Sequence, residues 1–144
     1  MTDYKSQISQ SEIIAKLEEM IGEPYELRGC VKFVARAFAL CGIVLELDPD
    51  ADPLRFLADA RKFSRVSVPQ FGDLAIFENI EGEEGYHVAF MVGRRWAFQS
   101  SRATNGVGRI EITRPEFAPF VRGFYRHEAM KVKAAVEAGI KPCS

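Results

Sequence analysis

The hydrophobic pattern of this chain changes near residue 63, and that change limits the folds open to it. Before this point apolar residues recur at helical spacing, whereas after it short apolar runs are separated by turn residues, as in strands. Helices followed by a run of strands favour an α+β fold with a mostly antiparallel sheet. With 144 residues, the chain is long enough to bury a core. We expect one domain over 1–144, with its core at about 10–126 and a C-terminal helix at about 128–138.

The stretch from Gly29 to Gly42, GCVKFVARAFALCG, predicts an amphipathic helix with a cysteine in its first turn. Backbone N–H groups at a helix N-terminus, and the positive end of its dipole, favour the thiolate form of such a cysteine, which is the nucleophilic form. Cys30 could equally be the first core residue of a buried helix, because cysteine is often buried. The predicted apolar stripe contains Cys30, Phe33, Val34, Ala37, Phe38 and Cys41.

Further elements follow from the same patterns. Pro24-Tyr25 is expected to be extended or a turn, because proline disfavours helix at the residue before it. A polar loop is expected from Ser101 to Gly108. We predict helices from Ser9 or Ser11 to Gly22 and from Pro53 to about Phe63, and strands at 66–68, 73–77, 87–92, 96–100, 109–113 and 120–125.

Composition argues against several classes of protein. A formal net charge of −1 gives no field that points to nucleic acid or to an anionic membrane. No stretch reaches the length of a transmembrane helix, and the N-terminus has no apolar region typical of a Sec signal peptide. Three cysteines without a CxxC pair argue against a disulfide framework, and the two histidines suggest no zinc site. We therefore expect synthesis in the cytoplasm, with no metal or cofactor.

A cysteine at a helix start, followed by His87 at a strand start, fits a cysteine hydrolase. Such a site needs an imidazole that takes the thiol proton and a polar group that orients the imidazole. If the turn near Gly93 has an odd number of residues, Gln99 shares a face with His87; an even number places Ser100 across from it. The sequence leaves both registers open. The acidic loop at 81–84 is expected to raise the pKa of His87.

Several other residues have simpler interpretations. Cys41 is expected in the core, and Cys143 in an exposed tail. His127 is expected to cap a helix or lie on the surface. The aromatic residues Phe90, Trp96 and Phe98 are expected in the core of the sheet, although one of them could line a substrate groove.

These residues together resemble the NlpC family of papain-like cell-wall cysteine peptidases, and most of all its short versions encoded with phage tails. The resemblance covers roughly residues 20–112. It implies that Cys30 is the nucleophile, that His87 is the base, that Gln99 orients His87, and that Tyr25 lies near the oxyanion. The matching segments are Pro24-Tyr25, Cys30-x-x-Phe33-Val34, Gly42-Ile43, Gly72-Asp73-Leu74 and His87-Val88 followed by Gly93.

The resemblance implies hydrolysis of an amide bond in peptidoglycan stem peptides through a thioester. An enzyme without a Sec signal would reach the wall by a phage tail, by lysis or by specialised secretion. Two alternatives remain at this point. The family usually has Asp-Cys-Ser where this chain has Gly29-Cys30-Val31, which favours a catalytically silent structural module of a phage tail or similar assembly. The other alternative is a papain-like amidase or acyltransferase with a substrate outside the wall.

Overall fold

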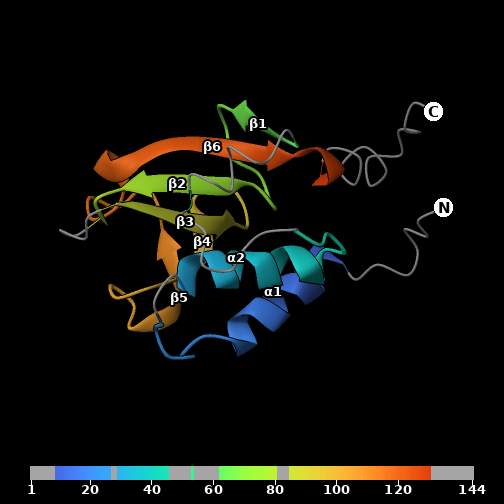
Figure 1. Ribbon diagram of the computed structural model, residues 1–144, viewed down its shortest axis with the longest axis horizontal. Coiled ribbons are helices and arrows are strands. Elements are labelled where there is room, and N and C mark those ends of the chain that lie inside the picture. The colour runs from blue at the N-terminus through green and yellow to red at the C-terminus, as the bar shows by residue number, and fades with distance from the viewer. Residues whose placement is uncertain (1–8, 27–28, 46–52, 54–61, 81–84, 131–144) are drawn as a thin grey trace.

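The protein has two N-terminal helices packed on a six-stranded sheet, as the computed structural model in Figure 1 shows. The structure describes residues 9–26, 29–45, 53, 62–80 and 85–130. Every neighbouring pair of strands is antiparallel, in the order β1-β6-β2-β3-β4-β5. This confirms the predicted α+β fold with a mostly antiparallel sheet. The elements are α1 (Gln10–Glu19), α2 (Gly29–Leu40), β1 (Phe63–Val66), β2 (Leu74–Glu78), β3 (Tyr86–Met91), β4 (Trp96–Ser101), β5 (Gly106–Glu111), the 3₁₀ turn η3 (Ala118–Phe120) and β6 (Val121–His127).

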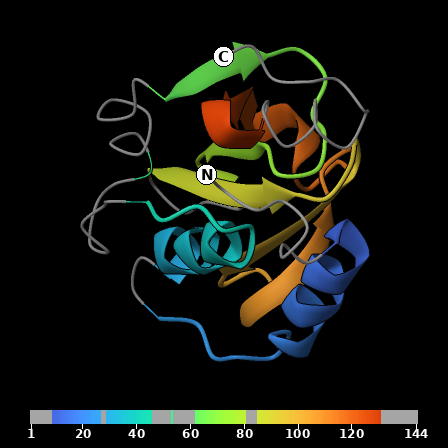
Figure 2. The same cartoon turned by 90° about the vertical axis from the view of Figure 1, so that its right-hand side faces the viewer.

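The predicted cap residues flank both helices, although α1 ends at Glu19, before the predicted Gly22. Ser9 is the N-cap of α1, and its hydroxyl accepts a hydrogen bond from the Glu12 N–H at 3.2 Å. Gly42 follows α2 with φ of 79°, the left-handed conformation of a glycine C-cap. Helix α2 packs on β3 and β4, and α1 lies beside it (Figure 2).

The two faces of the sheet bury separate cores. One core lies between the sheet and the helices, where Phe38 of α2 meets the ring of Phe90 edge-on at 5.5 Å. The other core lies on the opposite face and includes Phe77, Met91 and Phe117. Because successive side chains of a strand point to opposite faces, β3 contributes Val88 and Phe90 to the first core and Ala89 and Met91 to the second.

The hairpin of β3 and β4 has the odd register that the sequence left open. Phe90 pairs with Phe98, and Met91 pairs with Ala97. The Val92 N–H donates to the Trp96 carbonyl, so that Gly93, Arg94 and Arg95 form the turn. In this register Gln99 shares a face with His87, whereas Ser100 points to the other face.

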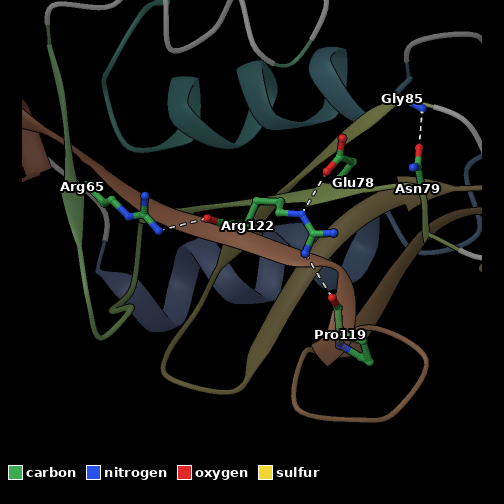
Figure 3. A network of polar contacts seen from close by, with 6 residues as sticks. All are labelled: Arg65, Glu78, Asn79, Gly85, Pro119 and Arg122. Carbon is green, nitrogen blue, oxygen red and sulfur yellow. Dashed lines mark hydrogen bonds and ion pairs between the residues drawn. The ribbon is translucent and has the colours of Figure 1, made fainter.

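The loop between β2 and β3 is closed by two hydrogen bonds at Asn79 and Gly85. The Asn79 N–H donates to the Gly85 carbonyl at 2.8 Å, and the Gly85 N–H donates to Asn79 Oδ1 at 2.9 Å (Figure 3). In the same figure Arg122 of β6 donates to Glu78 and to the Pro119 carbonyl. The Arg122–Glu78 contact joins the end of β2 to β6, and the Asn79–Gly85 contacts lie just before β3, the strand that carries His87.

The Gly72-Asp73 motif forms the turn before β2. Asp73 is fully buried, and both of its carboxylate oxygens accept hydrogen bonds from Arg126 of β6 at 2.8 Å. One oxygen also accepts from the Gln70 N–H at 2.7 Å. Because a buried carboxylate needs such partners, this motif connects the turn to β6 and has a structural role.

Some boundaries and burials differ from the sequence-based expectations. Phe63 starts β1 instead of ending a helix, because it pairs with His127 of β6. The polar loop is shorter than 101–108, since β4 runs to Ser101 and β5 begins at Gly106. Trp96 is 40% exposed and not in the core, with the Arg109 guanidinium 4.9 Å from its ring centroid. Residues 54–61 of the helix predicted from Pro53 to about Phe63, the acidic loop at 81–84 and the segment beyond Met130, including Cys143, lie outside the described residues.

His127 is buried, contrary to the expectation of a surface residue, because it packs against the rings of Phe63 and Phe38. The expected capping role is confirmed, since its Nδ1 accepts a hydrogen bond from the Ala129 N–H at 3.0 Å. In the part of the chain that the structure describes, no helix has the length and apolar character needed to cross a membrane.

Candidate active site

Helix α2 begins directly against strand β4. Gly29 is buried, and a Cβ atom at this position would lie 3.2 Å from the Ser100 hydroxyl oxygen. A side chain at this position would therefore require the Ser100 side chain to shift, which shows how close the start of α2 lies to β4. Cys30 follows in the first turn, half-buried, and packs against the core between the helices and the sheet. Val31, which the predicted stripe omitted, is also buried in this turn.

His87 and Gln99 form a buried hydrogen-bonded pair. Their side chains meet with His87 Nε2 2.9 Å from Gln99 Oε1. His87 is 9% exposed and Gln99 is 1% exposed. The odd turn thus brings the Gln99 side chain into hydrogen-bond contact with the imidazole.

The His87–Gln99 pair projects from the sheet face opposite to α2. His87 pairs across the strands with Phe77, a member of the far core, and the two rings are 5.8 Å apart. Cys30, in contrast, contacts the core on the helix side. His87 lies near the beginning of β3 and Gln99 near the end of β4, so both lie at the same end of the sheet. Ser100, the neighbour of Gln99, is the residue that Gly29 meets at this end.

Burial controls the protonation of His87. Desolvation lowers the pKa of its imidazole from the ordinary 6.5 to about 4, although the hydrogen bond to Gln99 acts in the opposite direction. The expectation that acidic neighbours would raise this pKa is therefore wrong, because the loss of hydration outweighs the other effects. Near neutral pH the imidazole is uncharged, and in that form it can accept a proton.

Thr104, which sequence reasoning missed, completes the polar cluster. The Gln99 side-chain N–H donates to Thr104 Oγ1 at 2.9 Å, and the Thr104 hydroxyl donates to the Gly106 carbonyl at 2.7 Å. Ser101 Oγ lies 3.3 Å from the same threonine oxygen. The only signal in the sequence is a threonine five residues after Gln99, in a turn whose shape the sequence does not define.

Tyr25 lies next to the turn that carries Thr104. Its segment pairs with β5, since the Val107 N–H donates to the Glu23 carbonyl at 3.0 Å. The Arg102 guanidinium lies 5.6 Å from the centroid of the half-buried Tyr25 ring. The structure thus brings Tyr25 to the same turn as the partner of Gln99. Within the described residues, no group of three or more His, Cys, Asp or Glu side chains could hold a metal ion.

The arrangement defines a class of fold: a helix with a cysteine in its first turn, packed on an antiparallel sheet whose neighbouring strands carry a hydrogen-bonded His and Gln. The overall arrangement of helices and strands matches that of solved NlpC/P60 proteins. The fold of this chain is therefore the NlpC/P60 fold that the sequence resemblance implies.

Three solved structures illustrate the likeness. An NlpC/P60 family protein from Bacillus cereus ATCC 10987 aligns over 84% of this chain with a TM-score of 0.63 and 23% identity. A lipoprotein-like NLP/P60 family protein from Staphylococcus aureus subsp. aureus Mu50 aligns over 88%, with a TM-score of 0.63 and 18% identity. The NlpC/P60 domain of the peptidoglycan hydrolase SagA aligns over 81%, with a TM-score of 0.53 and 20% identity.

The extent of these matches differs from one structure to another. This chain spans 41% and 45% of the first two chains, and 97% of the SagA domain. No protein-family profile and no curated protein sequence matches the chain. At these identities the comparisons establish the fold.

Proposed function

We propose that this protein is a cysteine peptidase of the NlpC/P60 type that hydrolyses an amide bond in peptidoglycan stem peptides. In this proposal Cys30 is the nucleophile, His87 is the general base and acid, and Gln99 orients His87. The observation that carries the proposal is the buried 2.9 Å contact between His87 and Gln99, at the end of the sheet where α2 begins. A buried imidazole held by a neutral amide is an arrangement suited to proton transfer.

The reaction has two stages. The Cys30 sulfur attacks the amide carbonyl carbon while the thiol proton passes to His87, which then protonates the leaving amine as the C–N bond breaks. Water, deprotonated by His87, attacks the resulting thioester, releasing the acid and restoring the thiol. The low pKa of His87 means that its imidazole is neutral at rest and can take up the thiol proton as the sulfur attacks.

The developing oxyanion needs hydrogen-bond donors. The positive end of the α2 dipole lies near Cys30, and the Cys30 backbone N–H is the first proposed donor. The Tyr25 hydroxyl is the second proposed donor.

The wall as substrate is supported by the fold shared with the NlpC/P60 domain of a peptidoglycan hydrolase. We propose that the protein reaches the wall through a phage tail, by lysis or through secretion machinery.

The test is digestion of purified muropeptides, with products identified by mass spectrometry. We expect new amine and carboxyl ends from the wild-type protein and none from Cys30→Ala. Cleavage of small amides or thioesters but not of muropeptides would contradict the proposal that peptidoglycan is the substrate. A protein that cleaves none of these substrates, and in which Cys30 does not react faster than Cys41 with iodoacetamide, would be a structural module instead.

A further inference from the structure

We infer that Thr104 is a positioning residue: its hydroxyl orients the Gln99 amide, and the amide determines which nitrogen of His87 carries the proton. The catalytic consequence rests on the proposed function. The orientation itself is a property of the resting protein and can be tested without a substrate.

The argument starts at the Gly106 carbonyl, a group that can only accept hydrogen bonds. Thr104 Oγ1 lies 2.7 Å from this oxygen, so the single hydroxyl proton of Thr104 is directed to it. The remaining capacity of Thr104 Oγ1 is that of an acceptor. The group of Gln99 that faces it at 2.9 Å must then be the donor, Nε2.

An amide with its nitrogen on one side has its oxygen on the other. Gln99 Oε1 therefore faces His87 Nε2 at 2.9 Å, and an oxygen there can only accept. His87 must donate from Nε2, which makes this the protonated nitrogen of the neutral ring and leaves a lone pair on Nδ1. In the proposed reaction Nδ1 is thus the atom that accepts the proton of the thiol.

Two features of the fold favour this single orientation of the Gln99 amide. Gln99 is 1% exposed, so solvent water does not compensate for a flipped amide that would present its oxygen to Thr104. Gly108 pairs directly with Gln99 across β4 and β5. A Cβ atom on Gly108 would lie 2.7 Å from Thr104 Cβ, so the missing side chain is what lets Thr104 fold back over the strand to reach the amide.

Ser101 strengthens the same orientation. Its hydroxyl oxygen lies 3.3 Å from Thr104 Oγ1, within reach to donate to the second lone pair of that oxygen. A threonine oxygen that already accepts from Gln99 and Ser101 has its own proton left for Gly106. The hydrogen bonds that link Gly106, Thr104, Gln99 and His87 are all satisfied only when the Gln99 oxygen faces His87.

The experiment is ¹⁵N NMR of the folded protein labelled at histidine, recorded near neutral pH, where both ring nitrogens report the tautomer. The chain has only two histidines, so His87→Ala assigns the spectrum. His127 is an internal reference, because its Nδ1 accepts from Ala129 and it lies outside this network. We expect His87 to be the Nε2–H tautomer in the wild type and in Thr104→Ser, which keeps the hydroxyl.

Thr104→Val removes the hydroxyl at nearly constant volume, so both amide orientations become comparable and His87 should show a mixture of tautomers. In Thr104→Val, kcat should fall roughly tenfold with KM little changed. Thr104→Ser should keep the turnover of the wild type. The matched control is Thr113→Val, which removes an exposed hydroxyl bonded to Glu111. If Thr104→Val does not fold, Thr104→Ala provides the same comparison.

A folded Thr104→Val or Thr104→Ala variant in which His87 remains the Nε2–H tautomer would overturn the inference. The Nδ1–H tautomer in the wild type would overturn it as well. A tautomer change in a protein whose wild type cleaves no muropeptide would support the role of Thr104 and count against the proposed function alone.

Discussion

Gln99 and His87, twelve residues apart in the sequence, meet inside the protein with Gln99 Oε1 2.9 Å from His87 Nε2. Both groups are uncharged near neutral pH, because burial lowers the pKa of His87 to about 4. A neutral amide can orient the imidazole, but it stabilises an imidazolium less than a carboxylate would. In the proposed reaction the imidazole therefore becomes charged only when the thiol proton is transferred to it.

The first prediction concerns the pH dependence of stability. The unfolded chain protonates His87 near pH 6.5, whereas the folded protein does so only near pH 4, so protons bind preferentially to the unfolded state in this window. The contribution to stability is complete above pH 6.5 and is lost as the pH falls toward 4, by roughly 3 kcal/mol. Urea unfolding across this range measures it.

The control for this measurement is His87→Gln, which removes the titrating group. The pKa of His127 is also lowered by burial, so its contribution has the same sign and remains in the variant. The difference in unfolding free energy between wild type and variant isolates His87. If both lose equal stability on acidification, His87 is not buried in its neutral form.

The second prediction separates a nucleophile from a core residue. Cys30→Ala should abolish hydrolysis and change the free energy of unfolding by less than about 1 kcal/mol, because the side chain is only half-buried. Cys41→Ala is the matched control: Cys41 is buried in the core, so we expect a loss of about 1–2 kcal/mol with turnover retained. Urea unfolding and muropeptide turnover are measured on the same samples. Hydrolysis that survives Cys30→Ala would exclude this residue as the nucleophile.

The third prediction concerns Gln99. Replacement by Ala removes the group that holds the imidazole and should lower turnover by roughly 10- to 1,000-fold. Gln99→His supplies a ring nitrogen in place of the amide and should retain most of the activity. Turnover is measured at a temperature at which circular dichroism shows both variants folded, because Gln99 is buried. Wild-type turnover in Gln99→Ala would show that another group orients His87.

The site could be predicted from the sequence as far as local rules reach. Helical spacing placed Cys30 in a first turn, and strand alternation placed Gln99 on the face of His87 once the turn was odd. The parity of that turn, set by three residues without a decisive turn signature, was beyond these rules. Thr104 was missed because its contact depends on a turn folding back over Gly108.

Errors arose where long-range packing decides. The pKa of His87 was expected to be raised by acidic residues nearby in the sequence, but desolvation by burial is the largest cause of its shift and lowers it. Trp96 has the large apolar side chain of a core residue, yet it is 40% exposed, with Arg109 against its ring. Phe63 begins a strand because β1 pairs with β6, sixty-odd residues later in the chain, and no local pattern carries that information.

The last prediction concerns Gly106, which connects the Tyr25 segment to the turn of Thr104. Gly106 has φ of +121°, and a Cβ atom there would lie 1.9 Å from the Glu23 carbonyl oxygen. Gly106→Ala should therefore combine backbone strain with a backbone clash and cost roughly 3 kcal/mol or more. It should also lower turnover at temperatures where the protein is still folded, because the Gly106 carbonyl accepts the proton of Thr104.

Gly22→Ala is the matched control for this substitution. Gly22 has φ of +95°, but nothing lies within 4 Å of a Cβ atom built there. The strain is therefore retained without the clash, and we expect a loss of about 1 kcal/mol with normal turnover. Urea unfolding of both variants gives the difference. Equal losses would mean that the Glu23 backbone does not lie against Gly106, and that the Tyr25 segment is not held at the site in this way.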